Sequence, residues 1–250
     1  MTKSALCKHF DETSWRNSGK NHYVWVASTS QAVCYKVDPS RSREAFERFV
    51  GNLGKAPTVT DRYGVYRCLQ KDHQYCMSHL IREFHSYAER DGPDGEIGGA
   101  IERSLQQACG IQSRFRRELI SHRSRNQRLR HCRKKLEYYL IDALAAGSEE
   151  LAGLSERILD HFDNLWVFAK FKDVDPTNNL AERDLRKLVL WRKKSYGTRS
   201  ERGKQFVERI TSVAGTVKRS GKNAMSFIQK VVSAFYSELD APHICAASGY

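Results

Sequence analysis

The chain has 250 residues, which is enough for one sizeable domain or for one domain with a large insertion. Hydrophobic residues make up 40% of the chain and aromatic residues 10%, a composition that excludes an intrinsically disordered protein. The formal net charge of +13 at pH 7 indicates a polyanionic partner, with DNA or RNA the leading candidate, although a generally basic cytoplasmic protein shows the same balance.

The first part of the chain is predicted to form strands and one helix. Runs rich in β-branched and aromatic residues at 9–16, 23–27 and 32–37 are separated by polar breaks, which is typical of adjacent antiparallel strands. Apolar residues on one face predict a helix over residues 41–52, and a short β-type run follows at 58–61. This order indicates the beginning of an α/β sheet.

The remainder of the chain, from residue 76 onward, has helical apolar spacing. Glycine, proline and asparagine predict loops at residues 91–95 and 173–179. The further predicted helices cover residues 97–109, 112–146, 149–171, 179–194, 200–219 and 223–239.

A strongly basic stretch runs from Arg114 to Lys135, with ten lysines or arginines and Glu118 as its only acid. Such a stretch fits a DNA-binding surface, because cations neutralise the phosphates of the backbone. It fits equally well an exposed helix without a ligand. The sequence leaves both interpretations open.

The cysteines and the ends of the chain bear on location. Seven cysteines occur at wide spacings and without a C-x-x-C pair, which fits reduced thiols better than a disulfide framework. The N-terminus has no apolar core of a signal peptide, and no apolar run approaches the roughly 18 residues of a membrane span. We therefore expect a soluble, intracellular protein.

Three acids occupy positions where a metal site can form. Asp11 lies within the first predicted strand and Asp61 ends the fourth, where a carboxylate is costly unless it is paired or binds a metal. Glu182 lies near the start of a predicted helix. Ordinary roles remain open from spacing alone: a turn residue for Asp61, and a first-turn helix acid paired with Arg186 for Glu182.

Four blocks of the sequence closely resemble, in order, the motifs of transposases of the insertion sequence 66 family. They are DET at 11–13, VTDRYGVY at 59–66, QYCMSHLIREF at 74–84, and PTNNLAERDLR at 176–186 followed by WRKKSYGTRS at 191–200. With the helices that follow, the resemblance covers the chain from Asp11 to about Leu239. Several blocks in the family's order make a specific match.

The resemblance implies an α/β, ribonuclease H-like fold with a mixed sheet and a large helical insertion between the second and third catalytic acids. Residues 1–84 and 173–240 are then expected to form the two parts of the catalytic domain, and residues 85–172 the insertion. Residues 241–250 are expected to be a flexible tail.

The resemblance also implies a DDE-type DNA transposase, with Asp11, Asp61 and Glu182 as catalytic acids that hold two Mg²⁺ ions, for which Mn²⁺ can substitute. Asp11 is a better candidate than Glu12, because neighbours in a strand point to opposite faces. The expected reaction is cleavage and strand transfer at transposon ends. A non-catalytic DNA-binding remnant and a ribonuclease H-like nuclease without strand transfer remain alternatives.

Basic residues that follow Glu182 are expected to contact DNA phosphates, unless they form only a solvated helix face. In the same helix, Ala181, Leu185 and Leu188 are expected to face the core. The candidate DNA-binding residues are Arg183, Arg186, Lys193, Lys194 and Arg199.

The partners implied by the resemblance are double-stranded DNA at transposon ends and target sites, further copies of the chain on DNA, and accessory transposon proteins. No membrane partner is expected. The implied location is the prokaryotic cytoplasm, with association to the nucleoid when the protein is bound to DNA.

Cys76 and His79 lie three residues apart on a predicted helix, which offers too few ligands for a zinc site. A similar C-x-x-H often follows the second acid of DDE transposases. The resemblance therefore suggests a structural or DNA-positioning role, while simple helix packing remains open.

Two features depart from the family. The chain begins ten residues before Asp11, so we expect the family's upstream DNA-recognition and zinc-binding regions to be missing from it. Tyr196 stands where the family commonly has a second glycine in a turn, so we expect an altered loop there.

Overall fold

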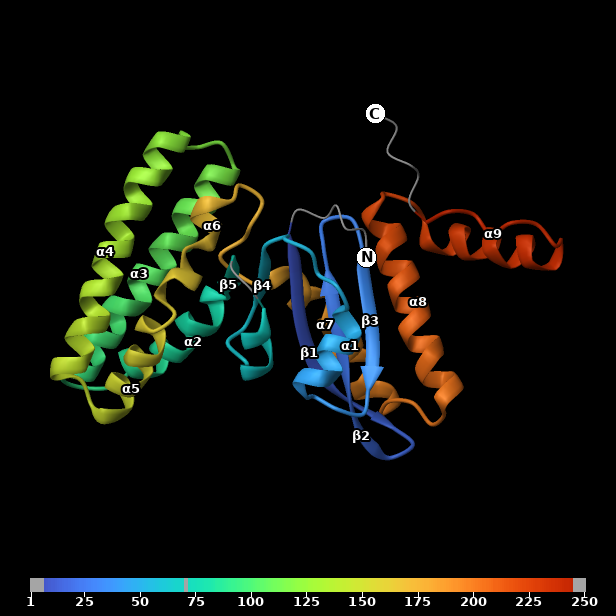
Figure 1. Cartoon of the computed structure of the whole chain (residues 1–250), viewed down its shortest axis with the longest axis horizontal. Helices are drawn as coiled ribbons and strands as arrows, with labels where there is room; N and C mark the ends of the chain where they lie inside the picture. The colour runs from blue at the N-terminus through green and yellow to red at the C-terminus, as the bar shows by residue number, and fades with distance from the viewer. Residues whose placement is uncertain (1–6, 70–71, 245–250) are drawn as a thin grey trace. The chain divides into compact units, whose positions relative to one another are not determined.

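The computed structural model describes residues 7–69 and 72–244 (Figure 1). The chain divides into two compact units. The first unit comprises Met1–Ala56, Gly64–Cys68 and Asn179–Tyr250, and the second comprises Pro57–Tyr63 and Leu69–Asn178. Residues 1–6, where no signal peptide is expected, and the part of the expected tail from residue 245 onward lie outside the described residues.

The first unit begins with an antiparallel sheet of β1 (Lys8–Asn17), β2 (Lys20–Ser28) and β3 (Val33–Asp38), which confirms the predicted strand order. The β1–β2 turn places Ser18 and Gly19 in the left-handed region at φ 51° and 77°. Two successive left-handed residues match the right-handed twist of the strands they join.

The helices of the first unit cover both faces of this sheet. One face packs against α1 (Arg43–Val50), where Phe46 contacts the rings of Phe10, Trp25 and Tyr66 at centroid distances of 5.0–5.6 Å. Tyr66 lies in the short 3₁₀ helix η1 (Gly64–Cys68). The other face packs against α7 (Asn179–Ser195) and α8 (Glu201–Arg219), whose apolar residues form a core cluster with the strands. That cluster contains Trp15, Val24, Val26, Val33, Tyr35, Val37, Ala181, Leu185, Leu188 and Val207.

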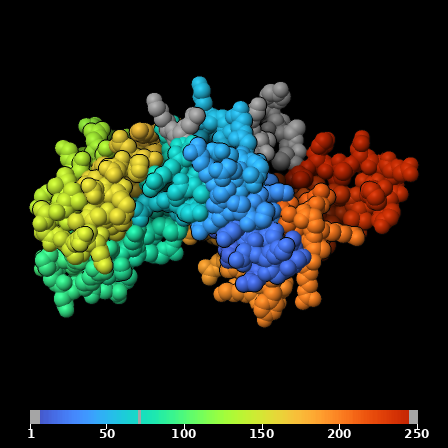
Figure 2. All heavy atoms as spheres, turned by 60° about the horizontal axis from the view of Figure 1, so that its bottom comes forward, coloured from blue at the N-terminus to red at the C-terminus, as the bar shows by residue number. Residues whose placement is uncertain are grey.

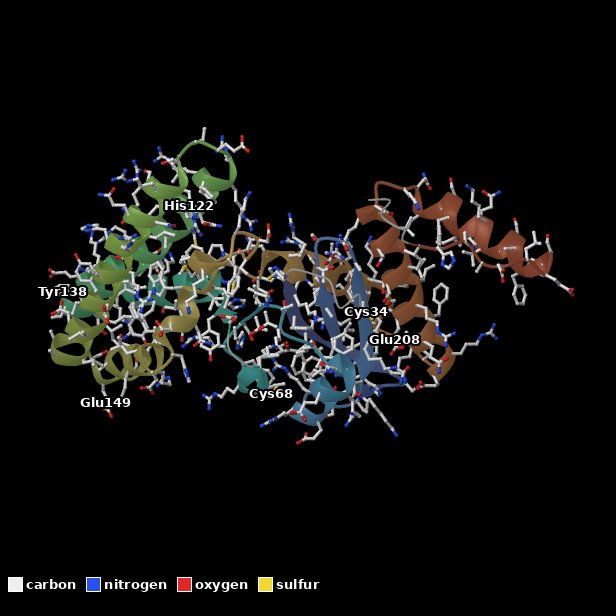
Figure 3. All side chains as sticks on the ribbon, turned by 45° about the horizontal axis from the view of Figure 1, so that its top comes forward. Cys34, Cys68, His122, Tyr138, Glu149 and Glu208 are labelled. Atoms are coloured by element: carbon white, nitrogen blue, oxygen red, sulfur yellow. The ribbon has the colours of Figure 1, made fainter. Side chains whose placement is uncertain are left out.

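Helix α8 (Glu201–Arg219) lies along the edge strand β3, and α9 (Ala224–Tyr236) follows it. Side chains of α8 at intervals of four residues accept the backbone N–H groups that β3 presents at its edge. The pairs are Thr216 with Val33 at 3.1 Å, Ser212 with Tyr35 at 2.9 Å, and Glu208, labelled in Figure 3, with Val37 at 2.8 Å. These bonds satisfy donors that would otherwise template aggregation.

The second unit pairs β4 (Thr58–Thr60) with β5 (His73–Tyr75) in parallel and continues into helices. With antiparallel pairing in the first unit, the strand pairing of the chain is mixed, and the α/β class is confirmed. The helices are α2 (Met77–Ala88), α3 (Pro93–Arg116), α4 (His122–Ala146), α5 (Glu149–Leu159), η2 (Phe162–Leu165) and α6 (Val167–Lys170).

The predicted break between helices at residues 110–111 is wrong. Helix α3 continues to Arg116, because a glycine inside a helix costs only about 1 kcal/mol and the buried residues beyond it extend the apolar face. The break falls at Glu118, which adopts a left-handed φ of 59°, and Ser121 then caps α4 by accepting the N–H of Ser124.

The single helix predicted over residues 149–171 is also wrong, since α5 ends at Leu159. The amide of Gln74 on β5 donates to the carbonyl of Leu165 at 3.1 Å and accepts the N–H of Phe168 at 2.9 Å. These bonds to a strand replace the bonds of a continuous helix. Strand β5 itself was not predicted because, unlike Thr58–Thr60, its residues His73–Tyr75 include no β-branched side chain.

We predict that the second unit loses stability on mild acidification because of His73. Burial, with a smaller contribution from His161, lowers the pKa of His73 to about 3. The unfolded chain, with an ordinary histidine pKa near 6.5, binds a proton that the folded chain excludes, so stability falls as pH drops below about 6.5. Between pH 7 and pH 5 the loss should be about 2 kcal/mol, measured by urea unfolding.

The variant His73→Gln should flatten this dependence, whereas His131→Gln, at an exposed position on α4, should leave it unchanged. An unaltered pH slope in His73→Gln would contradict the prediction.

Candidate active site

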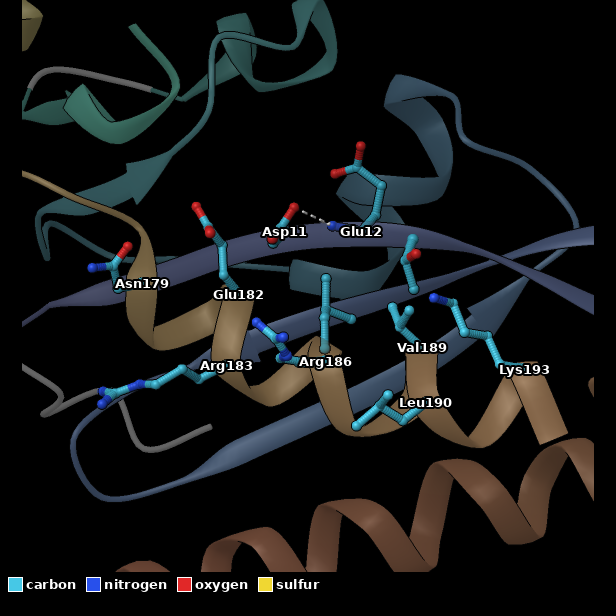
Figure 4. A pocket seen from close by; sticks show the side chains of 11 residues that line it. Asp11, Glu12, Asn179, Glu182, Arg183, Arg186, Val189, Leu190 and Lys193 are labelled. Carbon is cyan, nitrogen blue, oxygen red and sulfur yellow. Dashed lines mark hydrogen bonds between the residues drawn. The ribbon is translucent and has the colours of Figure 1, made fainter. Parts of the chain in front are cut away.

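The first unit contains a pocket of about 550 Å³ between β1 and α7 (Figure 4). Asp11 from β1 and Glu182 from α7 (Asn179–Ser195) both line it, although 171 positions separate them in the sequence. Figure 4 shows the two carboxylates beside each other. Two acids predicted from separate motifs are therefore brought together.

The neighbouring carboxylates of Asp11 and Glu12 have different partners. Asp11 is partly buried, and its Oδ1 accepts the N–H of Glu12 at 2.9 Å, which fixes the carboxylate. The Glu12 side chain is 1% exposed and accepts hydrogen bonds from the Arg41 guanidinium, at 2.5 and 2.9 Å, and from the Tyr66 hydroxyl. Glu12 also lines the pocket, but its carboxylate is held by Arg41 and Tyr66, and the choice of Asp11 over Glu12 stays a prediction.

The register of α7 places Glu182 at the pocket. Ala181, Leu185 and Leu188 are buried in the core cluster, which confirms their predicted orientation. Glu182 lies in the first turn, where the positive end of the helix dipole stabilises a carboxylate.

Helical spacing also accounts for the rest of the pocket wall on α7. Asn179, Glu182, Arg186, Val189 and Lys193 recur at intervals of three and four residues, so they share one face. Asn179 was not among the predicted site residues, although its position three residues before Glu182 would have indicated it.

The candidate DNA-binding residues divide into two groups. Arg183, Arg186 and Lys193 line the pocket and are exposed. Within the described part of the chain they form no ion pair, and the alternative pairing of Arg186 with Glu182 is not seen. Lys194 and Arg199 are exposed but do not line the pocket.

Asp61 lies in the second unit, directly after β4, as its predicted strand-end position requires. Its Oδ1 accepts the N–H of Tyr63 at 2.9 Å, and its carbonyl accepts the Thr60 hydroxyl at 2.5 Å. Thr60 also lies 2.7 Å from Nε2 of His73. Asp61 therefore has a turn role, and its contribution to a metal site stays a prediction.

Cys76 is buried immediately before α2, and His79 is partly buried in the first turn of that helix. The Cys76 N–H donates to the Thr60 carbonyl at 2.8 Å, and its Sγ accepts the N–H of Asn178 at 3.1 Å. Cys76 thus joins the strand that precedes Asp61 to the segment that precedes α7. These contacts fit the structural half of its expected role.

The model of the family described as Transposase IS66 family matches residues 2–206. The chain belongs to this family. The matched residues of the transposase include all the candidate acids and bases and the Cys76–His79 pair, whereas α9 lies beyond them. No curated protein matches the chain. Within residues 7–69 and 72–244 of the transposase, no helix combines the length and the apolar character needed to cross a membrane.

The loop after α7 of the transposase depends on Gly197. Both Tyr196 and Gly197 are left-handed, at φ 57° and 99°, so the turn is formed without a glycine at position 196. Backbone bonds of 2.8 Å tie Thr198 to Arg16 and Ser18 at the end of the β1–β2 hairpin. A side chain at Gly197 has no room, because its Cβ would lie 2.1 Å from the Arg16 carbonyl oxygen.

We predict that Gly197→Ala destabilises the first unit by about 2–4 kcal/mol, from left-handed strain and the clash with Arg16. The matched control is Gly64→Ala, where a Cβ meets no atom within 4 Å and φ is not positive. Urea unfolding should show a loss for Gly197→Ala and a change within about 0.5 kcal/mol for Gly64→Ala. Equal stabilities of the two variants would contradict this account of the loop.

Proposed function

We propose that this transposase cleaves DNA at transposon ends and transfers the strands to target DNA, with Asp11, Asp61 and Glu182 as the acids that hold two Mg²⁺ or Mn²⁺ ions. The observation that carries the proposal is the meeting of Asp11 and Glu182 in one pocket beside exposed bases. Family membership supports transposition as the biological process.

The donor set fits a hard divalent cation. Among the residues that line the pocket, Asp11, Glu12 and Glu182 offer carboxylate oxygens. Carboxylate oxygens are the protein ligands that Mg²⁺ and Mn²⁺ prefer. When bound, a pair of such ions stabilises the attacking and the leaving oxygen of an in-line displacement at phosphorus.

Asp61 enters the proposal through its motif and not through a measured distance. In a ribonuclease H-like sheet the first two acids come from neighbouring strands, and Asp61 follows β4 as that arrangement requires. The same proposal includes the ribonuclease H-like fold and the role of Asp61 as a metal ligand. It also includes the oligomer on DNA and the accessory transposon proteins.

The protein's own groups would position the DNA. Arg183, Arg186 and Lys193 would neutralise phosphates next to the strand that is cut, because they are exposed on the pocket wall that holds Glu182. The nucleophile is water in the cleavage step and the freed 3′-hydroxyl in the transfer step. Each step is an in-line displacement, and no side chain becomes covalently linked to DNA.

We predict that Asp11→Asn, Asp61→Asn and Glu182→Gln each lower Mg²⁺-dependent strand transfer by on the order of 100-fold or more, because each removes a charged metal ligand. The assay resolves joined and nicked products of labelled DNA that carries the element's own ends. The matched control is Glu44→Gln, which neutralises an exposed acid on α1 that does not line the pocket.

Full activity in any of the three acid variants would disprove that residue's assignment. Nicks without joined products from the unaltered protein would favour a nuclease, and mobility shifts without cleavage would favour a DNA-binding remnant.

A further inference from the structure

The basic stretch from Arg114 to Lys135 contains cations with different structural roles. Arg125 is 2% exposed, and burial lowers the pKa of its guanidinium. It donates to the side chain of Gln112 at 2.7 Å and to the carbonyl of Phe168 at 2.8 Å. Arg125 therefore holds the second unit together and is not available to a ligand.

Two other arginines in this stretch have acidic partners. Arg116 pairs with Asp175 at 2.7 Å, and Arg133 pairs with Asp163 at 2.6 Å. Exposed pairs of this kind contribute at most about 1 kcal/mol to stability. They nevertheless neutralise the two cations locally, so the ligand-binding potential of the stretch resides in other residues.

Arg123, Arg130 and Lys134 form a basic stripe on α4. At 100° per residue they fall within about 40° of one another around the helix axis. All three are exposed, and in the described chain none of them forms an ion pair. The opposite side of α4 carries Leu129 and Leu136, which are buried. The stripe therefore points away from the helical core of the second unit.

Figure 3 labels His122 in the first turn of α4 and Tyr138 in its C-terminal half, and nitrogen-tipped side chains project outward between these labels. Figure 2 shows the atoms of this yellow-green segment at the surface of the unit. No acidic residue occurs between Leu119 and Leu136. A local cluster of unpaired cations on one helix face attracts a polyanion.

The spacing of the stripe fits a nucleic-acid backbone. With a rise of 1.5 Å per residue, Arg123 and Arg130 lie about 10 Å apart along the axis, and Arg130 and Lys134 about 6 Å. These intervals are comparable to the separations of phosphates along a strand, and long flexible side chains can adjust to them.

We propose that the basic stripe is a further binding surface for the phosphate backbone of double-stranded DNA, in addition to the pocket of the first unit. The inference rests on the proposed function, because DNA is taken as the substrate. It adds a surface in the second unit that contributes affinity without reading sequence, since contacts to phosphates carry no base information.

The composition of the stripe favours duplex DNA over other polyanions. A surface for single-stranded nucleic acid typically interleaves aromatic side chains with cations, and no phenylalanine, tyrosine or tryptophan occurs between His122 and Glu137. A membrane-bound helix needs an apolar face that is free to enter lipid. Along the stripe, the apolar residues Leu129 and Leu136 of α4 are buried, and the exposed apolar residues Tyr138, Ile141 and Leu144 follow Lys134.

The test measures how the full-length protein binds a labelled 30-base-pair duplex of unrelated sequence at several NaCl concentrations in EDTA. The variant R123Q/R130Q/K134Q removes the stripe, and glutamine keeps good helix propensity. We expect its affinity to fall at least tenfold at low salt. The slope of log K against log[NaCl] should decrease in magnitude by about 2–3, since each phosphate contact contributes about 0.9.

The matched control is R103Q/R157Q/K172Q, which removes the same charge from exposed positions of the second unit outside the stripe. It should change the slope by less than about one contact. The variant R123K/R130K keeps the charge and should bind as the unaltered protein does, which separates a lost charge from a damaged fold.

An unchanged slope and affinity in R123Q/R130Q/K134Q would overturn the inference, as would an equal effect of the control. Stronger competition by single-stranded RNA than by duplex DNA would overturn the choice of partner. Because binding is measured in EDTA, these outcomes do not depend on cleavage. If the acid assignments are wrong, the binding result can still be interpreted. If the stripe does not bind DNA, strand transfer can still be tested.

Discussion

The geometry of the candidate active site depends on how α7 is fixed to the sheet, and the buried carboxylate of Asp184 is the central contact. It accepts the hydroxyl of Ser28 on β2 at 2.7 Å and pairs with Arg219 at the end of α8. A buried charge is tolerated only when it is paired in this way, so removing either partner is costly. Asp184 thereby ties β2, α7 and α8 together two residues after Glu182.

The neighbourhood of Asp184 extends this constraint to the edge strand. The Tyr35 hydroxyl on β3 donates to the Asp184 carbonyl at 3.1 Å. Burial, together with the charge of Asp184, raises the pKa of Tyr35. The phenol thus remains a neutral donor, and the same residue receives the Ser212 contact from α8 through its backbone N–H. Helix α8 is therefore fixed both by the Asp184 carboxylate and by the edge of β3. Helix α7, which carries Asp184, is fixed to the strands and to α8 by the same contacts.

A single strand, β1, supplies both the core and the site because its side chains alternate. Phe10 and Glu12 serve the α1 side, where Glu12 forms a buried network with Arg41 and Tyr66. Asp11 lines the pocket with residues of α7, and Trp15 packs in the core cluster with residues of α7. The preference for Asp11 over Glu12 follows from alternation alone, since the period of a strand is two residues. Other features could not be predicted, because they depend on contacts between distant residues. For example, the helical pattern after α5 is interrupted where the Gln74 side chain bonds to the backbone of Leu165 and Phe168, and this contact is not visible in the local sequence.

The basic residues of the chain also show what the sequence alone could not predict, because their exposure depends on distant contacts. They divide into two groups with different expected effects on DNA. The basic stretch from Arg114 to Lys135 is uniform in sequence, although the structure buries Arg125 in the core and leaves the stripe on α4 exposed. Cations that contact phosphates away from the reacting bond stabilise the ground state and the transition state equally, so they increase occupancy but not the rate of the bound complex. In the proposed active site, bases beside Glu182 would lie where charge changes during the displacement, and only there could they accelerate the chemistry.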